Sequence, residues 1–398
     1  MVRWQQQNKI YSEIETKNTY HDCFNTIERQ RAWVEIDLNA LAHNVRTIKS
    51  LLSPQTALMA VVKADAYGHG VQAVAQTVLQ NGADWLAVAT LTEGIELRQA
   101  EINCPILVLG AVNSAEEIIE ISKWQLQPTI CNSQQALIFS DTLDKIRTTL
   151  PVHLKLDTGM SRLGTSWKNA LKFVKLVHQL PYLEIASVYS HLATADDPDP
   201  AMMLLQQQRF DIAIAELQAH NLTPSCLHLA NSAATIRDRS LHYDLVRVGL
   251  ALYGLYPAPH LKSKIQLKPV LQIKARVTQV KTIAPNTGVS YGHQFVSDRE
   301  MTIAVVSIGY ADGVVRNLSN RLQAIIRGQL VAQIGAITMD QLMLDVTDIA
   351  NLQPGEIVTL LGQDGEQTIT ADDWANSLNT ISWEILCGFK HRLPRVMK

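Results

Sequence analysis

The chain has 398 residues, of which 47% are hydrophobic and 18% are charged, a composition that excludes a disordered chain and supports a large buried core. Its 35 Lys and Arg balance 37 Asp and Glu to a net charge of -2, and no stretch concentrates basic residues, which argues against nucleic acid as a partner. The length allows about two or three ordinary domains, although one barrel can take up most of it.

Residues 1–31 are expected to form a polar extension. They contain no apolar core of a secretion signal, and nothing in the chain approaches the run of roughly 18 apolar residues that spans a membrane. The cysteines form no CxxC pair and no short-spaced Cys/His cluster, so we expect neither a disulfide framework nor a metal site. These features predict a cytoplasmic protein with no membrane partner. The cysteines are Cys23, Cys104, Cys131, Cys226 and Cys387.

Between residues 32 and 260, short apolar segments alternate with amphipathic stretches, which is the pattern of parallel βα units. Eight such segments within about 190 residues favour a closed (β/α)8 TIM barrel, and an open doubly wound sheet is the alternative with the same alternation. The expected strands are Leu58–Val62, Trp85–Ala89, Ile106–Leu109, Gln127–Ile130, Val152–Leu156, Ile185–Tyr189, Ser225–Leu229 and Leu245–Val248. The expected helices include Val71–Leu79, Ala115–Trp124, Trp167–Gln179 and Met202–Gln218.

Residues 261–398 have a different pattern of apolar segments, which predicts a mostly β C-terminal domain. Their apolar segments are short, β-branched and separated by Gly, Pro, Asn or Asp, as in antiparallel sheets. The segment Trp33–Leu38 also looks like a strand and could belong to either domain. The expected strands after residue 260 are Val270–Val280, Met301–Ile308, Leu322–Ile326, Leu330–Ile334, Gln341–Asp345 and Glu356–Leu361.

In such a barrel the catalytic groups lie at the C-terminal ends of the strands. The first expected strand leads into Lys63, whose amine can act as a nucleophile or form a Schiff base, although it could equally lie at the rim or pair with Asp65. Small polar turns follow the last two strands, at Asn231-Ser232 and Gly249, where barrels bind phosphate. The alternative is that Asn231 and Ser232 only cap the next helix. A Schiff-base lysine opposite a phosphate cup suggests pyridoxal phosphate.

Two further basic residues lie near the same strand ends. Arg247 could donate to the pyridine nitrogen of such a cofactor and weaken the ring as an electron sink, or it could pair with Asp244. His191 could pack against a bound ring, although a lone histidine near a strand end is more often structural.

The segment from Ala60 to Gly70 resembles the cofactor-lysine signature of bacterial alanine racemases, which are fold type III enzymes dependent on pyridoxal 5'-phosphate. The similarity extends from about Trp33 to Arg395 and leaves the N-terminal extension unmatched. It implies a barrel followed by a C-terminal β domain. Other matching segments begin at Lys155 (KLDTGMSRLG), Ser190 (SH), His228 (HLANSAA), Val246 (VRVG), Ser290 (SYG), Gly309 (GYADG) and Met339 (MDQ).

The resemblance implies an isomerase that interconverts L-alanine and D-alanine by two-base proton transfer and supplies D-alanine as a peptidoglycan precursor. Lys63 would carry the cofactor and serve as one acid/base, and Tyr291 would serve as the other. Racemisation needs such a pair, because inversion requires a proton donor on the side of Cα away from the base.

The same resemblance assigns roles around the cofactor. Arg247 matches the pyridine-nitrogen partner, Arg162 the arginine near the phenolic oxygen and the substrate carboxylate, and Lys155 a lysine that is often carbamylated and then orients that arginine. The backbone of Met339 would meet the substrate carboxylate. The remaining cofactor candidates, most of them at the phosphate, are Tyr67, His191, Asn231, Ser232, Gly249, Leu250 and Trp383.

Trp383 departs from the family pattern, which usually has a tyrosine that donates to the phosphate and shapes the substrate entrance. An indole can donate through its N–H but is bulkier. Family members are also head-to-tail homodimers, so Tyr291 and Met339 would enter the barrel of a partner subunit and make the active site composite.

Three rival functions remain open at this level. A fold type III decarboxylase would lose CO₂ where a racemase abstracts a proton, and the Ser290-Tyr291-Gly292 match speaks against it. A racemase of another small amino acid, such as serine, would share the residues named above. A carrier protein for pyridoxal phosphate would need the barrel alone, and the residues after Tyr256 argue against that.

Overall fold

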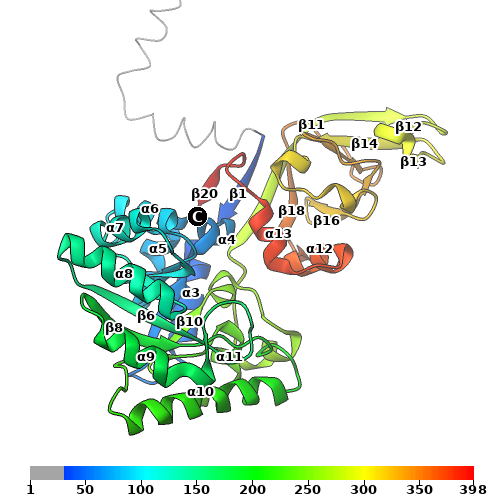
Figure 1. The fold of residues 1–398 in the computed structure, drawn as a ribbon. Coiled ribbons are helices and arrows are strands. Elements are labelled where there is room, and N and C mark those ends of the chain that lie inside the picture. The colour runs from blue at the N-terminus through cyan, green and yellow to red at the C-terminus, as the bar shows by residue number, and fades with distance from the viewer. Residues whose placement is uncertain (1–30) are drawn as a thin grey trace, which may run out of the picture. The chain divides into compact units, whose positions relative to one another are not determined.

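The computed structural model describes residues 31–398, which cluster into two compact units. Residues 37–271 form the barrel unit, and residues 31–36 together with 272–397 form the sheet unit (Figure 1). The predicted extension, except for its last residue, and Cys23 lie outside the described residues. No helix of the described part is long and apolar enough to cross a membrane.

The barrel unit contains eight parallel strands in the order β10-β2-β3-β4-β5-β6-β8-β9. The backbone N–H of Arg247 donates to Ala230 O at 3.0 Å and that of Asp244 to Leu227 O at 3.1 Å, which brings β10 onto β9 and nearly closes the ring. The predicted TIM-like barrel is therefore confirmed over the open sheet. The strands are β2 (Ala57–Val61), β3 (Trp85–Val88), β4 (Ile106–Ala111), β5 (Gln127–Ile130), β6 (Leu150–Asp157), β8 (Leu183–Tyr189), β9 (Leu227–His228) and β10 (Leu245–Val248).

Helices connect the strands and run from blue to green around them in Figure 1. Their starts follow from local side chains: Thr90 and Glu93 form a capping box at α6, and Asn132 caps α8. The segment expected as one helix from Trp167 is a 3₁₀ turn, η1 (Trp167–Asn169), followed by α9. The helices are α3 (Leu38–Lys49), α4 (Lys63–Gly68), α5 (Val71–Gln80), α6 (Leu91–Gln99), α7 (Ala115–Lys123), α8 (Ser133–Ile146), α9 (Ala170–Gln179), α10 (Ala201–Ala219) and α11 (Ser232–Arg237).

The sheet unit is built on nine strands in the order β19-β18-β15-β16-β17-β14-β11-β1-β20. The long strand β11 pairs with β18 near its start and with β14 from Val277 onward, with an irregularity between Val277 and Gln279. The strands are β1 (Ala32–Ile36), β11 (Leu271–Ile283), β14 (Met301–Val306), β15 (Gln323–Ile326), β16 (Gln329–Ile334), β17 (Leu342–Asp345), β18 (Ile357–Asp364), β19 (Gln367–Ile369) and β20 (Arg395–Met397).

Strand β1 answers the question that the sequence left open for the segment at Trp33. It pairs in parallel with β20, with Val34 opposite Arg395, and the two strands lie side by side in blue and red in Figure 1. The expected boundary at residue 32 thus differs from the structure, in which the barrel unit begins after Ile36. The physical reason is that Trp33 and Val34 are buried by sheet partners from the far end of the chain.

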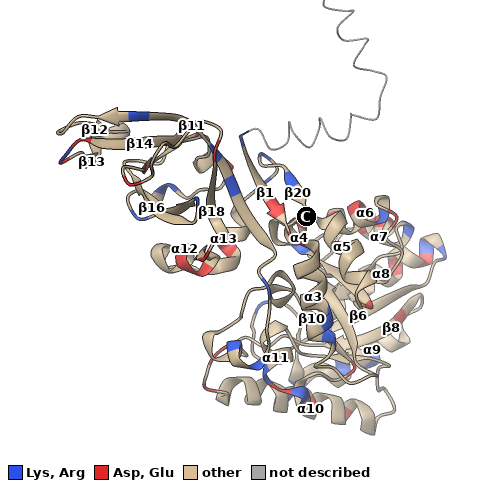
Figure 2. Cartoon of the chain, turned by 180° about the vertical axis from the view of Figure 1, so that it is seen from behind, with Lys and Arg blue, Asp and Glu red and all other residues tan. Residues whose placement is uncertain are grey.

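Two helices and a hairpin of the sheet unit were not expected from the sequence. The helices are α12 (Ala371–Leu378) and α13 (Ser382–Gly388), and the hairpin joins β12 (Gly288–Val289) to β13 (Phe295–Val296). A signal for α12 was present, because Thr370 and Asp373 form a capping box. The ribbon of α12 is red in Figure 2 where it carries acidic residues, and in its first turn Asp372 and Asp373 suit the positive end of the helix dipole.

Candidate active site

Lys63 leads a turn of unusual backbone conformation directly after β2. The four residues from Ala64 to Tyr67 all lie in the left-handed region, with φ between 52° and 56°. Side chains with a Cβ pay roughly 1–2 kcal/mol each for that conformation, and such strain is typical of functional sites. The turn begins where the barrel strand ends and leaves Lys63 half-buried at the barrel mouth.

Two carboxylates brace this turn. Glu93 accepts a hydrogen bond from the backbone N–H of Ala64 at 2.7 Å through one oxygen and from that of Ala89 at 2.7 Å through the other. Asp65 accepts from the N–H of Val71 at 2.8 Å, which links the turn to the start of α5. The sequence reasoning did not identify Glu93, although its place in the capping box of α6 marked it as a helix start.

Tyr67, Ser232 and Gly249 converge beside the turn. The backbone N–H of Gly249 donates to Ser232 Oγ at 3.1 Å, and a Cβ added at Gly249 would lie 2.7 Å from the hydroxyl of Tyr67. Only glycine lets the Tyr67 hydroxyl come this close to the backbone. We call Tyr67, Ser232 and Gly249 together the cup. Asn231 Oδ1 accepts from Ala234 N at 3.1 Å and so caps α11, and Leu250 starts the adjoining 3₁₀ turn η3 (Leu250–Tyr253).

Arg247 is buried in the barrel interior and is held by neutral partners. Its guanidinium contacts His228 Nδ1 at 2.9 Å and His191 Nδ1 at 3.1 Å, and it donates to Ser190 O at 2.7 Å and Leu229 O at 3.1 Å. Burial lowers the pKa of Arg247 to about 10. The carboxylate of Asp244, the alternative partner, accepts instead from the backbone N–H of Leu227 at 2.8 Å.

Lys155 lies close to Arg247, because both cations approach the same ring. Lys155 Nζ lies 5.1 Å from the ring centroid of Tyr189, and Arg247 Cζ lies 5.1 Å from the same centroid. Lys155 is only 6% exposed. Burial, and after it the charge of Arg247, lowers the pKa of Lys155 to about 8, with a smaller contribution from Arg162.

His191 shows that the predicted basic residues meet at one place. Burial lowers its pKa, and cationic neighbours lower it further. Those neighbours are Arg247, Lys155, Arg162 and Lys63, in decreasing order of effect. The barrel unit therefore gathers the predicted lysines, arginines and histidine at the mouth that also holds the cup of Tyr67, Ser232 and Gly249.

This donor set fits pyridoxal phosphate. The phosphate and the phenolic oxygen of that cofactor are anionic, and the mouth offers basic side chains, the hydroxyls of Tyr67 and Ser232 and the backbone N–H of Gly249. A half-buried lysine at the end of β2 supplies the amine that such a cofactor requires.

The remaining predicted residues belong to the sheet unit and are exposed there. Tyr291 is 75% exposed and Met339 is 52% exposed. Ser290 Oγ donates to Ala336 O at 2.7 Å, and the N–H of Ala311 donates to Met339 O at 3.0 Å, so the loops that carry these side chains are tied together. Trp383, on α13, is half-buried.

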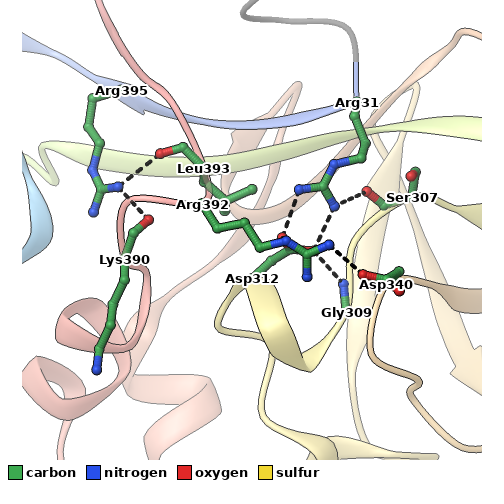
Figure 3. A network of polar contacts seen from close by, with 9 residues as sticks. All are labelled: Arg31, Ser307, Gly309, Asp312, Asp340, Lys390, Arg392, Leu393 and Arg395. Carbon is green, nitrogen blue, oxygen red and sulfur yellow. Dashed lines mark hydrogen bonds and ion pairs between the residues drawn. The ribbon is translucent and has the colours of Figure 1, made fainter.

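An ion-pair network supports the loop of Met339 (Figure 3). Arg31 donates to both oxygens of the buried Asp312, at 2.7 Å and 2.8 Å, and Asp312 also accepts from Gly309 N at 3.0 Å. Arg392 contacts Asp312 at 3.4 Å and is paired with Asp340, the neighbour of Met339. Segments that are far apart in the sequence thereby hold one exposed loop.

Comparisons with known proteins identify relatives across nearly the whole chain. The family model "Alanine racemase, N-terminal domain" matches residues 36–257, and "Alanine racemase, C-terminal domain" matches residues 270–397. An alanine racemase of Nostoc sp. is 66% identical over 369 residues, covering 92% of this chain and 96% of the relative. An alanine racemase of Synechocystis sp. is 65% identical over 369 residues, covering 93% of this chain and 99% of the relative.

Solved structures show the same likeness. The alanine racemase of Bacillus anthracis, described with bound L-Ala-P, superposes with a TM-score of 0.88 at 34% identity, covering 93% of this chain and 95% of that one. The alanine racemase of Clostridium difficile 630 superposes with a TM-score of 0.88 at 33% identity, covering 92% of this chain and 96% of that one.

Proposed function

Because this chain belongs to the alanine racemase family, whose enzymes are pyridoxal-phosphate-dependent isomerases, we propose that it interconverts L-alanine and D-alanine with Lys63 and Tyr291 as its two acid/base groups. The observation that carries the proposal is the strained turn that presents Lys63 beside a cup and a cluster of basic side chains at the barrel mouth. We take the barrel unit as the cofactor-binding domain.

Inversion at Cα requires a proton to leave from one face and another to arrive at the opposite face. The amine of Lys63 moves the proton on one face, and the phenol of Tyr291 moves it on the other. The bound cofactor supplies an electron sink that acidifies the α-proton. Tyr67, Ser232, Gly249 and Leu250 would hold its phosphate with Asn231 beside them, and Trp383 would stand where the family tyrosine donates.

Arg247 would face the pyridine nitrogen and keep it unprotonated. With a pKa of about 10 it remains a cation at neutral pH, and it is already fixed by four hydrogen bonds. A donor at that nitrogen weakens the electron sink and disfavours protonation at the wrong carbon, the route to transamination. His191 would contact the ring from the position in which Arg247 holds it.

We also propose that Lys155 is carbamylated. A buried amine with a pKa of about 8 is partly neutral near pH 7 to 8, so its nitrogen can attack CO₂ and release a proton to give an anionic carbamate. That anion would lie beside Arg247 and could orient Arg162 toward the substrate carboxylate, which the backbone at Met339 would also meet.

The exposure of Tyr291 supports a head-to-tail homodimer. A catalytic phenol needs a site that excludes water, yet Tyr291 is 75% exposed in the single chain. We propose that Tyr291 and Met339 complete the barrel mouth of a partner subunit. A cytoplasmic location, in which the free thiols of Cys104, Cys131, Cys226 and Cys387 stay reduced, and a role in supplying D-alanine for peptidoglycan complete the proposal.

One assay tests the reaction. The holoenzyme is incubated with L-alanine in deuterated water, and both deuterium at Cα and the formation of D-alanine are followed. The two-base proposal requires both signals. Deuterium exchange without inversion would contradict the assignment of two bases, and release of CO₂ would favour the decarboxylase. Faster turnover of serine than of alanine would favour the alternative substrate.

A further inference from the structure

The barrel interior contains a chain of hydrogen-bonded side chains that runs across five neighbouring strands. It starts at Arg247 on β10 and continues through His228 on β9, Ser187 on β8 and His153 on β6 to Gln127 on β5. The successive distances are 2.9 Å, 2.8 Å, 2.6 Å and 2.7 Å. The three middle residues are at most 1% exposed.

The direction of every hydrogen bond in this chain follows from its first member. A guanidinium can only donate, so His228 Nδ1 must accept and the ring must carry its hydrogen on Nε2. His228 Nε2–H then donates to Ser187 Oγ, and the single hydroxyl hydrogen of Ser187 goes to His153 Nδ1. His153 Nε2–H is left to donate to Gln127 Oε1. One orientation satisfies all members, and the reverse orientation would set two donors against each other at Arg247.

We propose that Ser187, His153 and Gln127 are positioning residues that hold His228 as its neutral Nε2–H tautomer and thereby fix the guanidinium of Arg247. This inference deepens the proposed function, because it rests on the role given there to Arg247 at the cofactor ring. Ser187, His153 and Gln127 are linked to one another by hydrogen bonds, and Ser187 is hydrogen-bonded to His228. They act through His228.

The surroundings of the two imidazoles favour the neutral forms that the chain requires. Burial lowers the pKa of His153 to about 3, and burial followed by the charge of Arg247 lowers that of His228 well below its ordinary value. Tyr189 stacks on His228 at 4.6 Å with planes 4° apart, and Trp85 meets His153 edge-on at 5.7 Å. The aromatic contacts fix the ring planes, so the nitrogen atoms stay aligned with their partners.

The series of hydrogen bonds from Arg247 to Gln127 also explains how the buried guanidinium of Arg247 remains charged without a carboxylate partner among the described residues. Every acceptor end in the chain points toward Arg247, so the aligned dipoles add at the cation. A barrel interior is ordinarily filled by layers of branched apolar side chains, which stabilise the fold without such a constraint. The polar layer therefore has a use beyond packing, and the orientation of Arg247 is the property it controls.

Neutron diffraction from deuterated crystals of the holoenzyme tests the chain directly. The proposal requires deuterium on Nε2 and not on Nδ1 of both His228 and His153, and on Ser187 Oγ toward His153. A doubly protonated imidazole or an Nδ1–D tautomer at either ring would overturn the proposal, whatever the role of Arg247 at the cofactor.

Variants test the consequence for the reaction. Ser187→Ala removes the central link, and we expect it to lower by about tenfold the number of racemisation turnovers per transamination event, with the KM for alanine changed less than about twofold. Ser140→Ala is the matched control, since Ser140 is buried in the same unit and donates to Pro181 O at 2.9 Å outside the chain. It should leave the ratio unchanged.

Gln127→Leu keeps the proposal falsifiable if the Ser187 variant does not fold. Gln127 is only half-buried, so the variant should fold, and loss of the terminal acceptor should lower the same turnover ratio by a smaller factor. Gln127→Glu retains an acceptor and should restore the ratio. An unchanged ratio in Gln127→Leu and Ser187→Ala would overturn the positioning role while racemisation by the unmodified enzyme still upheld the proposed function.

Discussion

The two units of the molecule present their functional residues in opposite ways. In the barrel unit, Arg247 and Lys155 are 4% and 6% exposed and are surrounded by their own chain. In the sheet unit, Tyr291 and Met339 are 75% and 52% exposed, while hydrogen bonds of neighbouring residues tie down the loops that carry them. The barrel thus holds its groups within one chain, whereas the two side chains of the sheet unit lie open to solvent in the single chain, as the proposed composite site would require. This contrast supports a composite site.

Tyr291→Phe tests the proposed role of the exposed tyrosine in the sheet unit and should have the largest effect. Removing the phenolic proton should slow racemisation by on the order of 10² to 10³, because general acid–base catalysis contributes factors of that size. Cα deuterium exchange in the direction served by Lys63 should persist. The measurement compares initial rates from L-alanine and from D-alanine. Tyr310→Phe, another exposed tyrosine of the sheet unit, is the control, and an equal loss in both variants would remove Tyr291 from its role.

Asp312→Asn tests the support beneath the exposed loops. The carboxylate is completely buried and binds Arg31 through both oxygens, so its loss should lower the free energy of unfolding by about 2–4 kcal/mol. Asp298→Asn serves as the control, since its ion pair with Arg299 is exposed and should contribute less than about 1 kcal/mol. Denaturant unfolding measures both. Equal stabilities would mean that the network in Figure 3 does not hold the loops.

The carbamate proposed for Lys155 gives a test of the barrel unit. The neutral amine is the reactive form, and its fraction rises as the pH increases through the pKa of about 8. At constant dissolved ¹³CO₂, a carbamate ¹³C resonance should therefore grow between about pH 7 and pH 9 and be absent in Lys155→Ala. Depleting CO₂ should lower activity about tenfold, the effect of one charged hydrogen bond. A resonance that survives in Lys155→Ala would assign the carbamate elsewhere.

Ala64→Gly tests the strain in the turn after Lys63. Glycine adopts positive φ without the steric cost, so the variant should gain up to about 1 kcal/mol in stability after its larger unfolded-state entropy is subtracted. Ala73→Gly, in the regular helix α5, should lose about 1 kcal/mol. Thermal unfolding compares the two, and a loss in both would show that the left-handed turn is not strained.

Trp383→Tyr is expected to have the smallest effect. It restores the residue usual in the family at a half-buried position, and a phenol can donate a hydrogen bond as an indole N–H can, so activity should be retained within a few-fold. Cofactor affinity, measured by absorbance titration, should stay equal or rise. An inactive, misfolded variant would show instead that the tryptophan has a packing role.

Much of the barrel could be predicted because its strands are local apolar runs. The strands that start at Trp85, Ile106 and Leu245 begin at the expected residues, since parallel strands buried on both faces leave a nearly continuous hydrophobic signal. The strands of the sheet unit were harder to predict from the sequence. Strand β20 and the pairing of β1 depend on partners more than three hundred residues away, which no window of sequence reveals.

The sequence by itself determined which chemistry was available: a lysine after the first barrel strand, small residues after the last two, and motifs that resemble one enzyme family. Only the tertiary structure decided how those groups are held. It brought Glu93 beneath the turn of Lys63, and it joined Arg247 to Gln127 through three buried side chains. The physical reason is that a hydrogen bond across strands depends on register and barrel closure, which arise from packing the whole chain and not from any local segment.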